Sequence, residues 1–249
     1  MTFAATPAVT FASGGETLLG VLHLPGGDGP HPIVVLLHGF PGNERNFDLA
    51  QELRRQGYAA LVFHYRGSWG VGGDWSWAHV LEDAAAVVAA VREDPRLDPR
   101  RVAVVGHSVG GFAALMTAAA DPAVQAVASV AGFDLGAAAA SPHASLVADW
   151  AGELLPLRGT SAEALVAEME AAGPSWQLAG LAPRLAGRPV LLIGTGRDPV
   201  SPPEVHHHPL VSAYGGSRLE HHVFPTDHAL SDHRVALSRT VAEFLDRHL

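Results

Sequence analysis

The pentapeptide GHSVG at residues 106–110 constrains the fold of this chain more than any other feature, because of the segments that flank it. Residues 101–105 before it form a β-branched run that predicts a buried strand, and the Ala-rich residues 111–116 after it predict a helix. A serine in the pattern G-x-S-x-G between a strand and a helix occupies a sharp, strained turn that exposes its hydroxyl at the end of a sheet. We therefore expect Ser108 to be a nucleophile held in such a turn.

Short apolar runs alternate with helical patterns along most of the 249 residues. The segments that predict strands are residues 18–24, 33–37, 59–65, 101–105, 124–131, 190–194 and 219–224, and those at 33–37, 59–65 and 101–105 are apolar enough to be buried. The patterns that predict helices are residues 46–56, 77–93, 111–116, 161–172 and 231–248. Strands that alternate with helices favour a mostly parallel, doubly wound sheet, so we expect an α/β fold.

One stretch interrupts this alternation. Residues 132–187 are too long for a single crossover and contain Ala- and Glu-rich helical pieces, of which 161–172 is the clearest. We expect a single domain over residues 1–249, with a small helical cap insertion at approximately 133–187. Because ligands bind at the carboxyl edge of open α/β sheets, the insertion is expected to form one wall of the site.

The composition excludes several classes of function. A formal net charge of −9 argues against nucleic acid or an anionic membrane surface as the main partner. The absence of cysteine excludes thiol nucleophiles, thiolate metal sites and disulfides. No apolar run is long enough to span a bilayer, and residues 1–10 lack the basic and apolar regions of a signal peptide. We therefore expect a cytoplasmic protein, and the sequence leaves a homo-oligomer open.

A serine hydroxyl becomes a strong nucleophile only when a base takes its proton and a carboxylate orients that base. On this kind of sheet the chain order is serine, then acid, then histidine. Asp198 lies in a Gly- and Pro-containing loop directly after the strand expected at 190–194. His228 lies between the last expected strand and the last expected helix. We therefore expect Ser108, Asp198 and His228 to form a catalytic triad.

Two other residues compete for these positions. Asp227 is next to His228 in sequence, but adjacent side chains rarely face each other as a triad requires. His233 falls inside the last expected helix, which makes it the second choice for the base. The run His206-His207-His208 invites a metal site, but consecutive side chains point in different directions and rarely bind one ion. We expect these histidines to lie on a polar helix face, and we expect neither a metal nor an organic cofactor.

The negative charge that develops on the attacked carbonyl oxygen needs two hydrogen-bond donors. One is expected to be the amide of Val109, the residue after the nucleophile. The other is expected in the loop at residues 38–42, which follows the strand predicted at 33–37. Phe40 is the candidate, because Pro41 cannot donate and biases Phe40 away from helical geometry. An ordinary Gly/Pro turn is the alternative for this loop.

Three tryptophans crowd the loop after the strand predicted at 59–65. This loop is expected to open at the same sheet edge as Ser108, so Trp69, Trp75 and Trp77 are candidates for a substrate pocket. The alternative is that they pack the loop onto the helical insertion. The sequence leaves these two possibilities equally open.

Together these residues resemble the α/β-hydrolases with a serine nucleophile. The resemblance covers nearly the whole chain and rests on His38-Gly39-Phe40, Tyr65-Arg66-Gly67, the GHSVG pentapeptide, residues 194–198 and Asp227-His228. The chain resembles the branch that includes small carboxylesterases, cinnamoyl or feruloyl esterases, and the catalytic domains of prolyl-oligopeptidase-like and acylaminoacyl peptidases. It lacks the His-Gly-Gly-Gly sequence of lipase-like members, because Phe40 follows Gly39.

The resemblance implies a serine esterase that cleaves a small-molecule carboxylic ester through an acyl-enzyme. A peptidase that releases an N-terminal or acylated amino acid is the second hypothesis. It needs a carboxylate in the pocket to bind a free amine, and the sequence alone does not identify one. A non-catalytic binding protein on the same scaffold is the third, and it is disfavoured because the serine, the acid and the base are all present.

Overall fold

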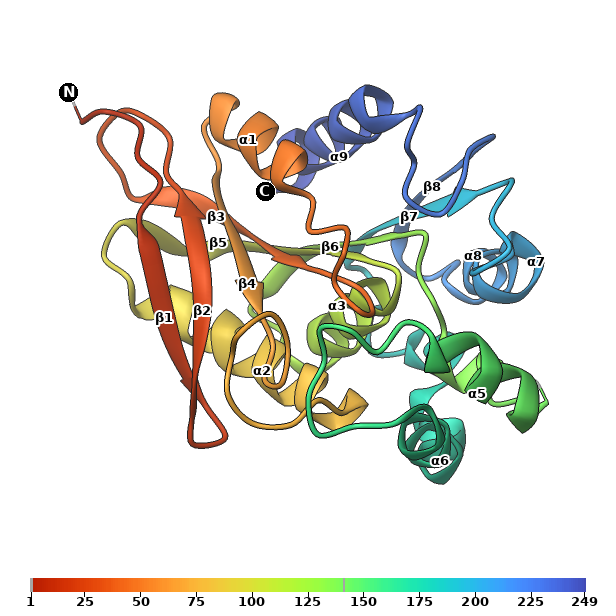
Figure 1. The fold of residues 1–249 in the computed structure, drawn as a ribbon. Helices are drawn as coiled ribbons and strands as arrows, with labels where there is room; N and C mark the ends of the chain where they lie inside the picture. Colours follow the sequence, from red (N-terminus) through yellow and green to blue (C-terminus); the bar gives the residue numbers. More distant parts are fainter. Residues whose placement is uncertain (1, 141) are drawn as a thin grey trace.

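The computed structural model describes residues 2–140 and 142–249, which form one eight-stranded sheet with helices on both faces (Figure 1). The strand order is β1-β2-β4-β3-β5-β6-β7-β8, and the six strands from β4 to β8 in this order run parallel to one another. Strand β2 is antiparallel to both of its neighbours, β1 and β4. The strands are β1 (Ala8–Ser13), β2 (Glu16–His23), β3 (His31–Leu37), β4 (Ala59–His64), β5 (Leu97–His107), β6 (Val124–Val130), β7 (Pro189–Thr195) and β8 (Arg218–Phe224).

The central strands are apolar because both of their faces are covered. Every residue of β7 is buried, and so are the last six residues of β3 and of β5. The edge strand β8 is mostly exposed. The expected mostly parallel α/β sheet is therefore confirmed. The hairpin strand β1 lies outside the predicted elements, because its short, half-exposed sequence gives a weak pattern.

The helices form two layers, which Figure 1 shows above and below the sheet. One layer consists of α1 (Phe47–Arg55) and α9 (Arg234–His248), and it packs an apolar cluster against one face of the sheet. The other layer contains α2 (Trp77–Ala90) and α3 (Val109–Ala120), and η1 (Val91–Glu93) extends α2. Two short helices, α7 (Pro203–His206) and α8 (His208–Ala213), lie between β7 and β8.

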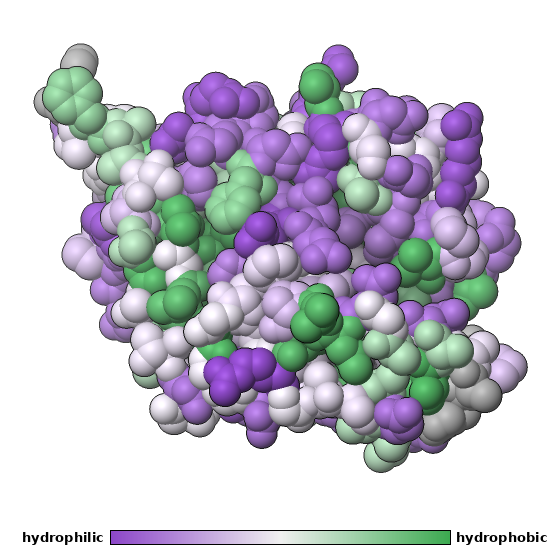
Figure 2. Space-filling model, in the orientation of Figure 1, coloured by the Kyte–Doolittle hydropathy of each residue, from purple (hydrophilic) through white to green (hydrophobic). Residues whose placement is uncertain are grey.

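We call residues 133–187 the cap segment, of which residue 141 lies outside the described part of the chain, as does residue 1. Between β6 and β7 the cap segment forms α4 (Leu135–Ala138), α5 (His143–Ala151), α6 (Ala162–Ala172), η2 (Gly173–Trp176) and η3 (Leu178–Leu181). Figure 2 shows apolar side chains gathering over the strands β1 and β2 and over the cap segment, whereas the surface over α1 and α9 is mostly hydrophilic.

The cap segment is fixed to the core at the start of α2. The first amides of a helix have no partner within the helix. The Glu168 carboxylate of α6 accepts hydrogen bonds from the amides of Trp77 and Ala78, at 2.9 and 2.7 Å. The Trp77 indole N–H in turn donates to the Leu165 carbonyl oxygen at 3.0 Å. The two helices therefore satisfy each other's polar groups across the boundary between cap segment and core.

No helix in the described ranges combines the length and the apolar composition needed to cross a membrane.

Candidate active site

Ser108 lies in a strained turn between β5 and α3. Its backbone has φ 57° and ψ −125°, a conformation that side-chain-bearing residues rarely adopt. The glycines two residues away are required by space: a Cβ on Gly106 would lie 1.8 Å from the Gly110 oxygen, and one on Gly110 would lie 2.0 Å from the Leu37 oxygen. The pentapeptide is therefore a sharp turn at the carboxyl end of β5, as its sequence predicts.

Asp198 follows β7 and His228 follows β8, and the structure brings the two side chains together. The distance between His228 Nδ1 and Asp198 Oδ2 is 2.7 Å. Because an ionised carboxylate can only accept, the imidazole carries its proton on Nδ1 and leaves Nε2 free to take a proton. Both residues lie at the same carboxyl edge of the sheet as Ser108.

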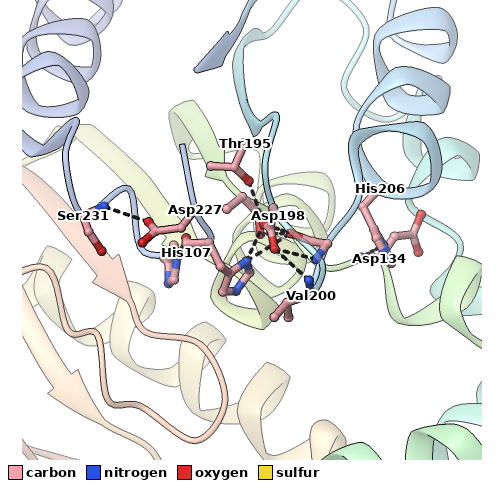
Figure 3. Close-up of polar contacts among 11 residues, drawn as sticks. His107, Asp134, Thr195, Asp198, Val200, His206, Asp227 and Ser231 are labelled. Carbon is pink, nitrogen blue, oxygen red and sulfur yellow. Dashed lines mark hydrogen bonds and ion pairs between the residues drawn. The ribbon is translucent and has the colours of Figure 1, made fainter. Parts of the chain in front are cut away.

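The Asp198 carboxylate is saturated with donors (Figure 3). Its Oδ1 accepts the amides of Val200 and Ser201 at 2.8 and 3.0 Å. Its Oδ2 accepts the hydroxyls of Thr195 and Ser201 at 2.6 and 2.8 Å, in addition to the His228 ring. Burial by itself would raise the pKa of Asp198, but these hydrogen bonds and the interaction with His228 hold it well below its usual range. Asp198 is therefore a fixed negative charge at neutral pH.

His107 bonds the backbone of the loop that carries His228. Its Nε2 lies 2.8 Å from the carbonyl oxygen of His228, so this nitrogen carries the proton and donates. Burial lowers the pKa of His107 to about 3, which keeps the ring neutral. The sequence pattern alone does not indicate this hydrogen bond, because it joins residues 121 positions apart.

The two competing residues are turned elsewhere. Asp227 is exposed, and its carboxylate accepts the amide of Ser231 at 2.8 Å (Figure 3). His233 precedes α9, and its ring bonds the neighbouring Asp232 at 2.8 Å. The carboxylate that contacts His228 is that of Asp198.

The two expected amide donors belong to the two segments next to Ser108, the start of α3 and the loop at 38–42. Val109 is the first residue of α3, so its amide has no partner within the helix. In the loop at 38–42, a Cβ on Gly39 would lie 3.3 Å from Ser108 Oγ, which shows how closely this backbone approaches the hydroxyl. Within the described ranges, the amide of Phe40 makes no backbone hydrogen bond. Both amides are therefore available to a ligand oxygen, and their part in catalysis remains a prediction.

A cavity of about 570 Å³ opens beside this group. One wall comes from loops at the strand ends and includes Gly39, Phe40, His107 and His228. The facing wall comes from the cap segment and includes Phe133, Leu146, Asp149, Trp150 and Glu153. Glu44, at the end of the loop that follows β3, adds a further carboxylate. The cavity has the size of a small-molecule site.

The three candidate tryptophans stand around the cavity rather than in its lining. Trp75 and Trp77 are 2% and 0% exposed, and they pack behind Phe40 with ring centroids at 6.3 and 5.4 Å. Trp69 donates its indole N–H to the carbonyl oxygen of Pro41 at 3.0 Å. The tryptophan that lines the cavity is Trp150 of α5, 5.9 Å from the Phe40 ring. The helical pattern of α5 carries no signal of which face would meet the strand-end loops.

Two of the three histidines at 206–208 are buried, and His208 is exposed. His206 and His207 are 7% and 6% exposed. The ring of His206 stacks on Phe133 at 4.5 Å, and its Nδ1 accepts the amide of Asp134 at 3.0 Å (Figure 3). The expected polar face is therefore wrong for His206 and His207, because His206 packs on the cap segment and His207 packs against Gly194 of β7. Among the residues that the structure describes, no three His, Cys, Asp or Glu side chains are grouped to hold a metal ion.

The sequence matches the family model described as "Alpha/beta hydrolase family" over residues 34–245. The quorum-quenching protein AidA of Acinetobacter baumannii (strain MDR-ZJ06) is 34% identical over 127 residues, which are 49% of this chain and 42% of that protein. Dipeptidyl aminopeptidase BIII of Pseudoxanthomonas mexicana is 35% identical over 99 residues, which are 35% of this chain and 14% of that protein. Each alignment thus covers less than half of the relative's length.

A solved structure is similar over almost its whole length. Est1E from Butyrivibrio proteoclasticus, solved with ferulic acid bound, has a TM-score of 0.74 and covers 96% of this chain and 98% of its own. Its 18% identity makes this a likeness of fold. Because the family model spans residues 34–245, most of the sequence, and the structure is a mostly parallel sheet covered by helices, this protein belongs to the α/β hydrolase family.

Proposed function

We propose that this protein is a serine hydrolase that cleaves carboxylic esters of small molecules through an acyl-enzyme. Ser108 Oγ attacks the ester carbonyl carbon while His228 Nε2 takes the hydroxyl proton. Asp198 orients the ring and stabilises the imidazolium that forms. The amides of Val109 and Phe40 bind the oxygen on which negative charge develops.

The remaining steps use the same groups in reverse. The tetrahedral intermediate collapses, the bond to the alcohol oxygen breaks, and His228 gives its proton to the departing alcohol. His228 then takes a proton from water, whose oxygen attacks the acyl carbon. A second collapse releases the carboxylic acid and returns the proton to Ser108.

The observation that carries this proposal is the 2.7 Å hydrogen bond from His228 to the saturated Asp198 carboxylate, at the sheet edge that presents Ser108. This arrangement leaves Nε2 as the acceptor on a base of fixed orientation. The family to which the chain belongs and the ferulic acid bound to Est1E support an ester as the substrate.

A second candidate function is favoured by the carboxylates of the cavity. Glu44, Asp149 and Glu153 line it, and these residues supply the negative charge that a peptidase needs to bind the free amine of an aminoacyl substrate. The similarity to a dipeptidyl aminopeptidase points the same way. In this alternative Ser108, Asp198 and His228 cleave an amide bond, and the leaving group is an amine.

Labelling with a fluorophosphonate tests the shared step. We expect an intact-mass adduct on the wild-type protein and none on Ser108→Ala, because the probe reacts with an activated serine. An unlabelled wild-type protein would refute the enzyme and favour a binding protein. A p-nitrophenyl ester and an aminoacyl p-nitroanilide, assayed in parallel, then separate the two candidates. Turnover of the anilide alone would replace the esterase by the peptidase.

A further inference from the structure

His38, the first residue of the loop at 38–42, makes a local hydrogen bond that bears on the direction of the Phe40 amide. His38 Nδ1 lies 2.8 Å from the carbonyl oxygen of Gly39. A carbonyl oxygen can only accept, so the His38 proton is on Nδ1 and the ring donates. Burial lowers the pKa of His38 to about 3, so the ring remains neutral at physiological pH.

This hydrogen bond controls the direction of an amide. The Gly39 carbonyl and the Phe40 N–H belong to one peptide group, which is planar and trans. The two bonds therefore point in opposite directions, and fixing the carbonyl fixes the N–H. Because the loop lies against Ser108, a rotation of this peptide would turn the Phe40 amide away from the hydroxyl.

The His38 ring is enclosed by buried aromatic side chains. The rings of Tyr65 and Trp75 lie 4.6 and 6.3 Å from the His38 ring, and all three side chains are at most 2% exposed. His38 Nε2 is buried and has no hydrogen-bond partner among the described residues, so the Gly39 carbonyl is the partner that orients this ring.

A second ring holds the next part of the same loop. Trp69 Nε1 donates to the Pro41 carbonyl oxygen at 3.0 Å, and the Arg45 guanidinium lies 4.5 Å from the centre of an indole ring of Trp69. Gly42 lets both rings approach: a Cβ there would lie 2.6 Å from Trp69 Nε1 and 2.8 Å from His38 Nδ1. Two carbonyls of one short loop are thus bound by ring N–H groups from behind.

We propose that His38 and Trp69 are positioning residues, whose ring N–H groups fix the loop at 38–42 so that the Phe40 amide points at the oxyanion formed on Ser108. This assignment rests on the proposed function of Ser108. It also gives Trp69 a role that differs from both possibilities that the sequence left open, a contact with the substrate and packing onto the helical insertion.

Two substitutions at His38 separate its nitrogens. The amide nitrogen of asparagine overlies Nδ1 of histidine, whereas that of glutamine overlies Nε2. His38→Asn therefore keeps the donor to Gly39, and His38→Gln loses it. We expect His38→Gln to lower kcat about 10- to 100-fold with KM within about twofold, because a misdirected donor costs most of an oxyanion-hole contact. His38→Asn should retain kcat within about fivefold of the wild-type value.

Trp69→Phe removes the indole N–H and keeps an aromatic ring. We expect kcat to fall by about three- to tenfold, since the Pro41 carbonyl is further from the reacting atoms. Trp176→Phe is the matched control, because Trp176 packs on Phe112, and its kcat should equal that of the wild type. In His38→Gln and Trp69→Phe, the affinity for a boronic acid analogue of the tetrahedral intermediate should fall in parallel with kcat.

Equal losses in His38→Asn and His38→Gln would overturn the proposal, as would a rise in KM without a fall in kcat. Amide hydrogen exchange of residues 39–43 supplies a readout that does not need turnover. We expect faster exchange in His38→Gln and Trp69→Phe than in Trp176→Phe. Unchanged exchange would refute the proposal that the two rings fix the loop. If the wild-type protein hydrolysed no substrate but the variants showed this exchange pattern, the proposed function would be refuted, and the positioning of the loop by His38 and Trp69 would stand.

Discussion

The two walls of the cavity differ in how firmly their side chains are held. On the strand-end wall, Asp198 accepts hydrogen bonds from two amides, two hydroxyls and an imidazole, and the carbonyl of His228 is bound by His107. On the cap wall, α5 has no side-chain cap, and its Asp149 and the following Glu153 are exposed. Apart from the rings of Phe133 and Trp150, this wall makes few specific contacts.

The difference suggests that one wall carries the catalytic groups and that the other determines which substrates bind. A catalytic group that moves by an ångström loses much of its effect, so it benefits from donors on rigid strand ends. A wall that only contacts the substrate tolerates variation, and an insertion can change without disturbing the sheet. We therefore expect substitutions on the strand-end wall to change kcat and substitutions on the cap wall to change KM.

The largest effect is expected from Asp198→Asn. The amide cannot hold the imidazole with its proton on Nδ1, so His228 loses the tautomer whose Nε2 is free to take a proton. We expect kcat to fall about 10³- to 10⁴-fold with little change in KM, measured on a p-nitrophenyl ester. The exposed Asp227→Asn is the control and should keep wild-type kcat. Loss of activity in Asp227→Asn instead would reverse the assignment of the acid.

The next effect is expected from Trp150→Ala on the cap wall. Removing a large ring from the cavity lining loses apolar contact with the substrate, which corresponds to a rise in KM of about tenfold. We expect kcat to stay within about threefold. Michaelis curves with esters of increasing acyl size test this, and Trp176→Phe serves as the control. A fall in kcat comparable to that of Asp198→Asn would abolish the distinction between the walls.

A smaller effect is expected from the carboxylates of the cap wall. The double variant Asp149→Asn with Glu153→Gln should lower kcat/KM about two- to fivefold for an ester that carries an ammonium group, since exposed charge pairs are weak. A neutral ester of the same shape should be turned over at the wild-type rate. The ratio of the two substrates, measured with rising salt, is the test. An unchanged ratio would remove the support for the peptidase alternative.

The last effect concerns the stability of the fold in acid, which depends on a histidine buried against β7. Burial lowers the pKa of His207 to about 4, below its ordinary value of 6.5. Between these values the unfolded chain binds the extra proton, so the folded state loses stability as the pH falls. His207→Leu should reduce this dependence by up to one proton, or about 1.4 kcal/mol per pH unit. Urea unfolding between pH 7 and pH 4.5 measures it.

The control for this measurement is the exposed His222→Leu, which should leave the slope of stability against pH unchanged. A slope that is equally steep in the wild type and in His207→Leu would contradict the expectation. If the cap segment alone unfolded first in acid, which hydrogen exchange can report, the strand-end wall would have to be regarded as the more acid-resistant part.

Order along the chain made the positions of Ser108, Asp198 and His228 predictable. Each stands just after a strand that ends at the same edge of a parallel sheet, so their proximity follows from topology. Their catalytic assignment remains a prediction. The composition of the cap wall was not predictable in this way, because no strand end marks which side chains of α5 face the cavity.

The tryptophans show the same limit within one loop. The sequence places Trp75 and Trp77 near the edge of the sheet, and they are near it. Whether an aromatic side chain faces a ligand or supports a wall depends on what packs against it. Here α6 supplies Leu165 and Glu168, which bind the start of α2 and enclose Trp77. That contact joins positions 88 to 91 residues apart, which no local pattern contains.

The left-handed backbone of Ser108 sets activity against stability at a single position. Glycine adopts such a conformation without the cost of about 1–3 kcal/mol that a side chain incurs. A laboratory selection for heat resistance alone would therefore favour Ser108→Gly, and the recovered protein would have lost the proposed nucleophile. Natural sequences that keep serine at a position of this geometry record selection for turnover, since folding by itself works against it.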